Sequence, residues 1–204
     1  MAGVGGVVRL ERAQTGKAAE VLARAFHDDP FYVTLMPDAQ SRPPRLAWFM
    51  ERMLRYGLQY GHVYTTPDVE GVACWFPPGH TRLTAADILR SGLYALPLRL
   101  GMGVHRRLTA FTGYTEPIRH RCVPTPHWYL LLLGVDRPCQ GQGIGGRLLR
   151  TVVDRATAEG VACYLETENE SNVEFYVRYG FRLAEAGCEP RYGIRMWGLL
   201  RPAA

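Results

Sequence analysis

One stretch of the sequence limits the fold more than any other: an apolar run, a glycine-rich loop and an amphipathic helix follow one another at residues 128–159. The run at 128–135 is long and apolar enough for a fully buried strand. After the loop, apolar residues recur at the spacing of one helix face, at Leu148, Leu149, Val152, Val153 and Ala156. The glycines at 140–146 let the backbone approach a ligand closely, and the free N–H groups of a helix N-terminus favour an anion. The sequence therefore predicts a strand, a phosphate-binding loop and a helix.

Length and composition favour a single domain that spans residues 1–204. Of the 204 residues, 47% are apolar and 21% are charged, which suits a packed core. No apolar run reaches membrane-spanning length, and residues 1–8 lack the basic start and apolar centre of a signal peptide. We therefore expect a cytoplasmic protein with no membrane partner.

The cysteines argue against a disulfide framework and against a metal site. There are five of them, widely scattered, with no C-x-x-C pair and no cluster of histidines nearby. An odd, dispersed set of this kind predicts reduced, buried thiols and no bound metal.

Positive charge is concentrated in residues 77–126. This segment holds seven arginines and two acidic residues, an excess equal to the net charge of +5 of the whole chain. A basic patch can attract nucleic acid. Aromatic and basic residues do not interleave on a strand pattern here, so we expect a small anionic ligand or a solvated helix face, and no nucleic-acid partner.

The N-terminal part of the chain predicts a short strand, two helices and a hairpin. Residues 7–11 alternate as in a strand, and an apolar stripe follows Thr15, which we expect to cap a helix. Residues 43–60 form a second amphipathic helix. Two runs rich in β-branched and aromatic residues, 62–66 and 72–76, flank a turn composition and predict an antiparallel hairpin.

The segment after the hairpin, residues 77–126, predicts a helical, basic insertion. The apolar residues that suit the buried face of a first helix are Ile88, Leu89, Tyr94 and Leu96. Those that suit a second helix are Leu100, Val104, Leu108 and Phe111. The insertion is expected to end in a proline-containing loop at 119–126, which leads back to the central strand.

The C-terminal part of the chain, after the helix that follows the glycine loop, predicts three strands and one brief helix. Residues 161–167 predict a strand, and Asn172 is expected to cap a brief helix that ends at Gly180. Two further strands are expected to begin at Phe181 and Tyr192.

Two common phosphate-binding loops fit the glycines poorly. Gly141, Gly143 and Gly146 satisfy G-x-G-x-x-G, and Glu166 lies near the distance of a ribose contact. In dinucleotide-binding folds, however, the strand runs almost directly into the first glycine, whereas residues 136–140 intervene here, and too little chain follows for the remaining units. A P-loop lacks its Gly-Lys-Ser/Thr element. We therefore disfavour both assignments.

Two short motifs stand in order along the chain. Gln140-Gly141-Gln142-Gly143-Ile144-Gly145 meets the pattern Arg or Gln, two residues, Gly, one residue, Gly or Ala, and Asn172, Tyr176 and Gly180-Phe181 follow downstream. Together they resemble the signatures of the GNAT superfamily of N-acetyltransferases. Within it, the chain is similar to the bacterial members related to puromycin N-acetyltransferase, strongly over residues 125–200 and more weakly elsewhere. This similarity rests on residues 72–75, 134–143 and 165–167 and on Phe175-Tyr176 before Gly180-Phe181.

The resemblance implies both a fold and a coenzyme. The fold is α/β (α+β), a mixed, mostly antiparallel sheet of about six to seven strands flanked by helices, with the helical insertion between strands 3 and 4. The coenzyme is acetyl-CoA, with its pyrophosphate on the backbone of the glycine loop and its pantetheine arm along the central strand. The residues expected to bind it are Leu133, Gly134, Val135, Gln140, Gly141, Gln142, Gly143, Ile144, Gly145, Gly146 and Asn172.

The resemblance also suggests catalytic residues. Tyr176 stands where the family places its general acid, and a phenol with a pKa of about 10 can protonate a departing thiolate. Family members often place a carboxylate on the central strand, but residues 128–135 contain none. Glu166 on the next strand is therefore the first choice, as general base or as anchor for a cationic substrate. His127, at the entrance of the central strand, is the second choice.

These observations predict an N-acetyltransferase that moves an acetyl group from acetyl-CoA to a primary amine of a small molecule by direct attack in a ternary complex. A catalytically degenerate acyl-CoA-binding sensor or regulatory module is the alternative, because the central strand lacks an acid. The identity of the amine and the oligomeric state stay open, with a homodimer as one option.

Overall fold

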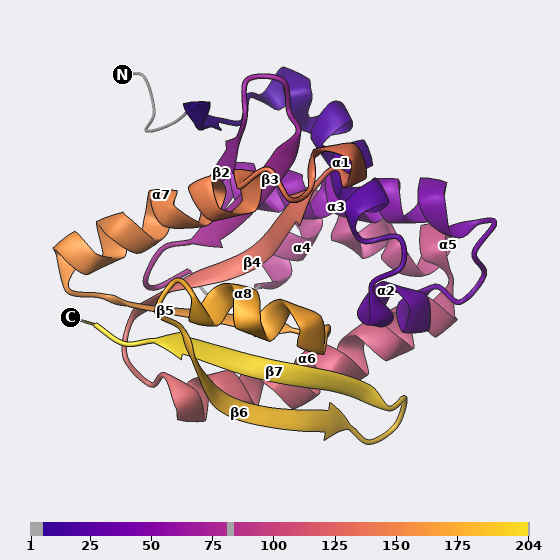
Figure 1. Cartoon of the computed structure of the whole chain (residues 1–204). Coiled ribbons are helices and arrows are strands. Elements are labelled where there is room, and N and C mark those ends of the chain that lie inside the picture. The colour runs from indigo at the N-terminus through magenta and orange to yellow at the C-terminus, as the bar shows by residue number, and fades with distance from the viewer. Residues whose placement is uncertain (1–5, 81–83, 204) are drawn as a thin grey trace.

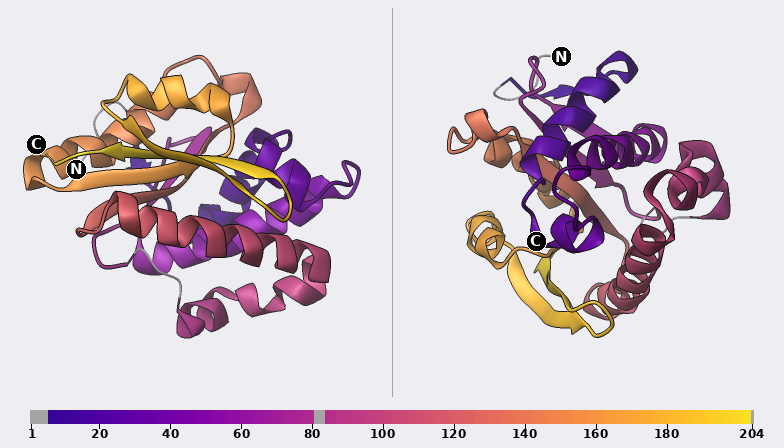
Figure 2. Two further views of the ribbon diagram at one scale, coloured as in Figure 1. Left: turned by 90° about the horizontal axis from the view of Figure 1, so that it is seen from below. Right: turned by 90° about the vertical axis from the view of Figure 1, so that its right-hand side faces the viewer.

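The computed structural model describes residues 6–80 and 84–203, which form a twisted seven-stranded sheet with helices on both faces (Figures 1 and 2). The strand order is β1-β2-β3-β4-β5-β7-β6, and every neighbouring pair except β4 and β5 is antiparallel. The strands are β1 (Val8–Arg9), β2 (His62–Thr65), β3 (Gly71–Phe76), β4 (His127–Val135), β5 (Ala162–Thr167), β6 (Arg182–Glu189) and β7 (Ile194–Arg201). The predicted mixed, mostly antiparallel sheet is thus confirmed.

Helices join and cover the strands. They are α1 (Thr15–Ala25), α2 (Pro30–Leu35), α3 (Arg42–Tyr60), α4 (Ala85–Ser91), α5 (Leu96–Leu100), α6 (Met102–Cys122), α7 (Ile144–Glu159) and α8 (Val173–Val177). Helices α4, α5 and α6 lie between β3 and β4, as expected for the insertion. Within the described ranges, no helix is both long and apolar enough to cross a membrane.

Each face of the sheet carries its own hydrophobic core. One core joins α1, α2, α3, α5 and α6 to residues such as Val72, Cys74 and Leu132 of the sheet. The other joins α7 and α8 to alternate residues of the same strands, among them Ala73 and Trp75. Because successive strand residues point to opposite faces, β3 contributes to both cores and all six of its residues are buried.

Strands β4 and β5 separate halfway along β4. Their parallel pairs run from His127↔Ala162 to Leu130↔Leu165 and then stop, although β4 continues to Val135. On the opposite edge of β4, Trp75 pairs with Leu130 and Cys74 with Leu132, so Leu131 is an extra residue in the strand. A β-bulge bends and twists the strand that contains it, which accounts for the divergence at this point.

Of the two predicted helix caps, Thr15 was wrong, and Asn172 has the predicted position without a capping hydrogen bond. Thr15 is the first residue of α1, and its hydroxyl donates to the carbonyl of Arg12 at 2.8 Å. Asn172 is the N-cap residue of α8, but its side chain makes no capping hydrogen bond. A side-chain cap is found one turn earlier, where Asn169 accepts from Ser171 N–H at 3.1 Å and starts the 3-10 turn Glu170–Asn172.

The insertion also differs from expectation. Ile88, Leu89 and Tyr94, predicted to be buried, are 38%, 65% and 62% exposed. Helix α4 is short and buries Asp87 and Ser91, and Tyr94 lies after it in the 3-10 turn Leu93–Ala95, which buries Leu93. The loop predicted at 119–126 is helical as far as Cys122, since α6 continues through Pro117. An internal proline costs a helix about 3 kcal/mol, and the packing of α6 against β6 and β7 offsets this cost.

Helix α2 was not predicted, although its signals are present in the sequence. The prediction placed a helix end at residues 27–30, whereas Pro30 is the first residue of α2 and Asp29 is its N-cap. Proline is tolerated at the first helical position because no backbone N–H is needed there. This helix brings Asp29 to the site described next.

Candidate active site

A cavity of about 490 Å³ lies over the glycine loop, between the end of β4, the start of α7 and α8. Gly141 and Gly143 have φ of +76° and +75°, which side-chain-bearing residues rarely adopt. Gly143 holds the N-cap position of α7 and offers no side-chain cap, so the first N–H groups of this helix are left for a ligand. An uncapped N-terminus of a four-turn helix attracts an anion such as a phosphate.

Most of the residues expected to bind the coenzyme line this cavity: Leu133, Val135, Gln140, Gly141, Gly143, Ile144, Gly145, Gly146 and Asn172. Gly134 does not, because it faces α1, where an added Cβ would come within 2.8 Å of Leu22. The Gln142 side chain donates to the carbonyl of Pro138 at 3.2 Å instead. Nine of the eleven expected residues therefore meet at one cavity.

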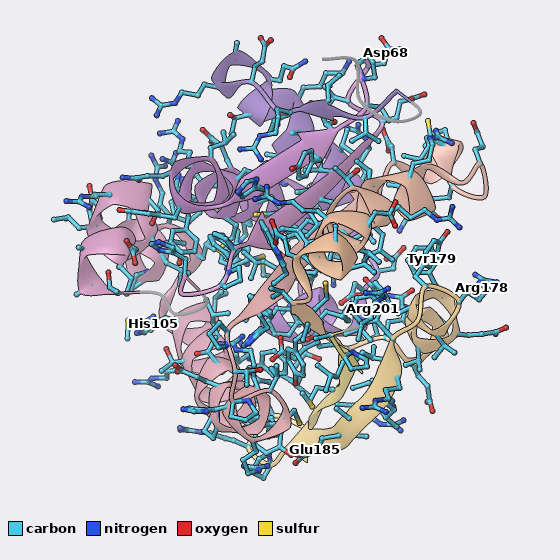
Figure 3. The ribbon with its side chains drawn as sticks, turned by 90° about the vertical axis from the view of Figure 1, so that its left-hand side faces the viewer. Asp68, His105, Arg178, Tyr179, Glu185 and Arg201 are labelled. Carbon is cyan, nitrogen blue, oxygen red and sulfur yellow. The ribbon has the colours of Figure 1, made fainter. Side chains whose placement is uncertain are left out.

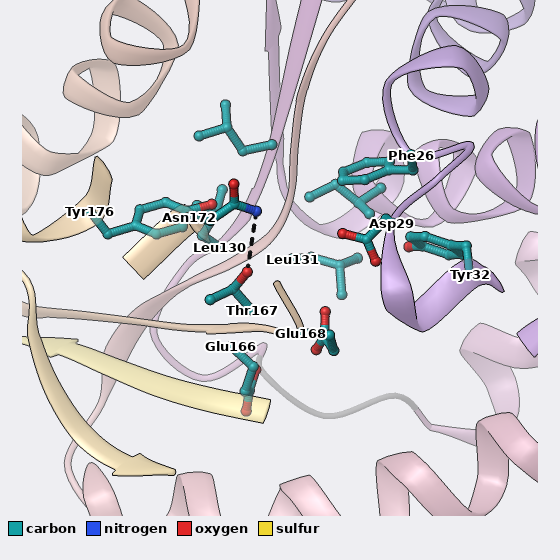
Figure 4. A pocket seen from close by; sticks show the side chains of 12 residues that line it. Phe26, Asp29, Tyr32, Leu130, Leu131, Glu166, Thr167, Glu168, Asn172 and Tyr176 are labelled. Carbon is teal, nitrogen blue, oxygen red and sulfur yellow. Dashed lines mark hydrogen bonds between the residues drawn. The ribbon is translucent and has the colours of Figure 1, made fainter. Parts of the chain in front are cut away.

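A second pocket, of about 50 Å³, opens where β4 and β5 separate (Figure 4). It is lined by Phe26, Asp29, Tyr32, Leu130, Leu131, Leu132, Leu133, Glu166, Thr167, Glu168, Asn172 and Tyr176. Leu133, Asn172 and Tyr176 line both this pocket and the cavity over the glycine loop. The two spaces therefore meet end to end at these three residues.

Two acids that the sequence did not single out, Asp29 and Glu168, line the small pocket. Asp29 comes from the N-terminus of α2, and Glu168 follows directly after β5. In Figure 4, Asp29 lies beside Tyr32 across the pocket from Tyr176, and Glu168 lies below. Signals for both existed: Asp before Pro is typical of a helix start, and Glu168 stands two residues after Glu166.

The structure holds Asp29 firmly. Its Oδ1 accepts a hydrogen bond from the N–H of Phe31 at 3.0 Å. The segment around it is held by Arg42, which is 3% exposed and donates to the carbonyls of His27, Met36 and Pro37. Because a buried guanidinium occupied by three carbonyls is costly to displace, the carboxylate of Asp29 is preorganised.

Burial raises the pKa of both carboxyl groups, and repulsion by neighbouring negative charges raises that of Glu168 further. Burial raises the pKa of Asp29 to about 6, although backbone N–H groups at the start of α2 oppose the shift. Burial also raises the pKa of Glu168 well above its usual range, and the neighbouring charges of Asp29 and Glu166 add to the increase. With its pKa at about 6, Asp29 is mostly ionised near neutral pH and able to accept a proton, whereas the raised pKa of Glu168 favours the protonated form of that carboxyl group.

Glu166 has a different environment. Its side chain is 5% exposed, and its Oε1 lies 3.6 Å from Nη1 of Arg119, whose guanidinium packs 4.4 Å from the centre of the Tyr129 ring. Burial raises the pKa of Glu166, whereas Arg119 and a hydrogen bond from Tyr129 lower it. Glu166 thus lines the pocket but already has a cationic partner.

Tyr176 lies at the junction of the two spaces and is 7% exposed. Burial raises the pKa of its phenol, and the negative charges of Glu168 and Asp29 raise it further. The group therefore stays protonated over the physiological pH range and can donate a hydrogen bond or a proton.

His127 lies outside both spaces. It begins β4, three residues before Leu130 of the small pocket and six residues before Leu133 at the junction, which correspond to about 10 Å and about 20 Å along a strand. Its ring Nδ1 is 2.7 Å from the carbonyl oxygen of Thr125, and burial lowers its pKa. It lines neither pocket nor cavity.

The comparisons with known proteins agree with this architecture. The family model described as the acetyltransferase (GNAT) family matches residues 97–181. An uncharacterised N-acetyltransferase of Schizosaccharomyces pombe is 30% identical over 182 residues, which cover 85% of this chain and 72% of that protein. The chain belongs to the GNAT family and is an acyltransferase.

Solved structures show the same fold. A Corynebacterium glutamicum protein, described as histone acetyltransferase HPA2 and related acetyltransferase, matches 97% of this chain and 96% of its own with a TM-score of 0.67 and 22% identity. Arylalkylamine N-acetyltransferase 2 of Aedes aegypti matches 96% of this chain and 97% of its own with a TM-score of 0.64 and 12% identity. At these identities the likeness extends to the fold alone.

Proposed function

We propose that the protein transfers the acetyl group of acetyl-CoA to a primary amine of a small molecule by direct attack in a ternary complex. The observation that carries this proposal is the junction at Leu133, Asn172 and Tyr176. It joins a cavity built for a phosphate-bearing coenzyme to a small acidic pocket. Such an arrangement brings donor and acceptor together without a covalent enzyme intermediate.

The residues over the glycine loop fit the coenzyme. The backbone N–H groups at the start of α7 would hold the pyrophosphate, and backbone groups of Leu133, Gly134 and Val135 would hold the pantetheine arm and the acetyl oxygen. When bound, acetyl-CoA supplies an activated thioester. Asn172, whose side chain donates to Thr167 at 3.4 Å, is positioned to contact the arm as it enters the junction.

The acidic pocket suits the amine. An ammonium group is attracted to the ionised carboxylate of Asp29, and it must lose a proton before its nitrogen can attack. We assign the acceptance of this proton to Asp29, directly or through a water molecule. Glu168, whose raised pKa favours the protonated form, would donate a hydrogen bond within the same pocket. Glu166, although paired with Arg119, contributes a negative charge to the lining of the same pocket. We therefore keep its predicted role as an anchor for a cationic substrate.

These acids also bear on the alternative of a non-catalytic acyl-CoA-binding module. That alternative was motivated by the lack of an acid on β4, and Asp29 and Glu168 supply carboxyl groups from neighbouring elements. His127 stays a prediction from the sequence. We further infer a single domain that works in the cytoplasm, since all five cysteines are free thiols, as is usual in a reducing compartment. Kinship with puromycin-acetylating enzymes and a homodimeric assembly remain proposals from the sequence.

A two-stage experiment tests the proposed function. Calorimetric titration should show binding of acetyl-CoA and CoA, and thiol release should follow when amines are added. The amine panel should include alkylamines, polyamines, aminonucleosides and arylalkylamines, the last because the mosquito structure is named for them. Failure to bind the coenzyme would remove the proposal, and binding without thiol release from any amine would favour the non-catalytic module.

Tyr176→Phe is expected to lower kcat about tenfold while the Kd of CoA stays the same. The loss is smaller than is usual for a general acid, because burial raises the pKa of this phenol and weakens it as a proton donor. Steady-state kinetics and calorimetry measure the two quantities. Tyr164→Phe is the matched control, since Tyr164 is a buried tyrosine that lines neither space. An unchanged kcat in Tyr176→Phe would reassign the acid.

A further inference from the structure

Arg178 is the one charged residue among those that line the cavity over the glycine loop. It follows α8 directly, and its side chain is exposed. Figure 3 shows Arg178 and Tyr179 together at the end of α8, close to α7. The sequence motifs did not single it out, because they concern the glycines and the neighbouring Asn172 and Tyr176.

The guanidinium of Arg178 is available for a ligand. Among residues 6–80 and 84–203, no hydrogen bond or ion pair involves its side chain. Two arginines on the facing helix have partners: Arg147 donates to the carbonyl of Gln142 at 3.2 Å, and Arg150 lies 5.5 Å from the centre of the Tyr179 ring. A cation without a partner at the edge of a cavity favours an anionic group there.

The cavity over the glycine loop has two distinct ends. Its inner end is the junction with the acidic pocket at Leu133, Asn172 and Tyr176. Arg178 comes six residues after Asn172, which is about 9 Å along a helix, and its side chain is exposed, away from the buried junction. The start of α7 lies beside the helix between them, since a Cβ at Gly145 would be 3.6 Å from Phe175.

Coenzyme A has the same order of groups. Its thiol leads through the pantetheine arm to the pyrophosphate, and the ribose with its 3′-phosphate follows. With the thiol at the junction and the pyrophosphate on the glycine loop, the next anionic group outward is the 3′-phosphate. This monoester carries a charge of about −1.5 to −2, and a guanidinium can bind it with two parallel hydrogen bonds.

We propose that Arg178 binds the 3′-phosphate of coenzyme A and thereby makes the protein prefer CoA to dephospho-CoA. The proposal rests on acetyl-CoA as the donor and adds a residue that recognises the nucleotide end of the coenzyme. Arg178 is a binding residue here and takes no part in the transfer of the acetyl group.

The test is a set of calorimetric titrations of the full chain with CoA and with dephospho-CoA. The wild-type protein is expected to bind CoA about tenfold more tightly than dephospho-CoA at about 0.1 M salt. Arg178→Gln should bind CoA about tenfold more weakly and show no preference, while its affinity for dephospho-CoA stays at the wild-type value. Arg182→Gln, which removes an exposed arginine of β6 outside the cavity, should behave like the wild type.

Each other outcome has a distinct meaning. If Arg178→Gln weakens both ligands equally, the guanidinium contacts the pyrophosphate and the proposal is overturned. If the wild-type protein shows no preference, the 3′-phosphate is not recognised and the proposal is likewise wrong. If the wild-type protein binds neither ligand, the donor itself is wrong, so the proposed function fails first. Circular dichroism of Arg178→Gln verifies that the exposed substitution leaves the fold intact.

Discussion

Replacing Asp29 with asparagine is expected to lower kcat/KM for the amine about a hundredfold or more while the Kd of CoA changes by less than about twofold. The variant cannot accept the proton of the ammonium group, and it loses the negative charge that attracts it. Asparagine is as good an N-cap as aspartate, so the hydrogen bond to Phe31 and the start of α2 should persist. Steady-state kinetics with saturating acetyl-CoA measures the effect.

The pH profile provides a second readout. Because the pKa of Asp29 is raised to about 6, its carboxyl is protonated below that pH and ionised above it. The kcat/KM of the wild-type protein should therefore rise with pH through about 6, and this limb should be absent in Asp29→Asn. Asp28→Asn is the control, since Asp28 is an exposed neighbour that pairs with Arg137. Equal kcat/KM for Asp29→Asn and wild type would return the role of base to Glu166.

Gly145→Met is expected to weaken CoA binding about a hundredfold or more, because the new side chain fills the space over the glycine loop. At this position, a loss of affinity reports filling of the cavity, because the substitution introduces no backbone strain. Gly145 is in α7 without a positive φ, and an added Cβ would meet nothing closer than 3.6 Å, at Phe175 and Val135. The thermal midpoint of the free protein should therefore not fall.

A matched control exists on another helix. Gly16 of α1 is exposed, and an added Cβ there meets no atom within 4 Å. Gly16→Met should bind CoA like the wild type. If Gly145→Met retains its affinity, the coenzyme does not lie against the start of α7, and the assignments of Gly141, Gly143 and Gly146 as its contacts would have to be abandoned.

The cavity over the glycine loop, where we propose that the coenzyme binds, could be predicted from the sequence because its determinants are local. A buried strand, glycines that tolerate positive φ and an amphipathic helix stand next to one another in the chain, and Gly141 and Gly143 do adopt that conformation. Tyr176 follows a motif of a few residues. In each case the physical requirement and the residues that meet it lie within one short segment.

The acidic pocket, where we propose that the amine binds, could not be predicted in the same way, because it depends on tertiary structure. Asp29 and Glu168 belong to distant segments, and they meet only because α2 packs beside the point where β4 and β5 separate. Asp29-Pro30 was interpreted as the end of a helix, whereas the same residues begin the next one. For the short helix α4, the apolar periodicity predicted the wrong buried face, since Leu89 is exposed. A helix of seven residues needs only a few packing contacts, so its buried face need not be apolar.

The separation of β4 from β5 leaves two strand edges without each other as partners inside one sheet. Edges of this kind on a protein surface invite strands of other chains and lead to aggregation. Here the open edges lie within the molecule, between the segment that carries Asp29 and Tyr32 and the residues Asn172 and Tyr176. The pocket at this separation has a volume of only about 50 Å³, far less than a strand with its side chains requires. Under the proposed function, this unpaired edge would serve the unbranched arm of the coenzyme, while its position inside the molecule keeps it from strands of other chains.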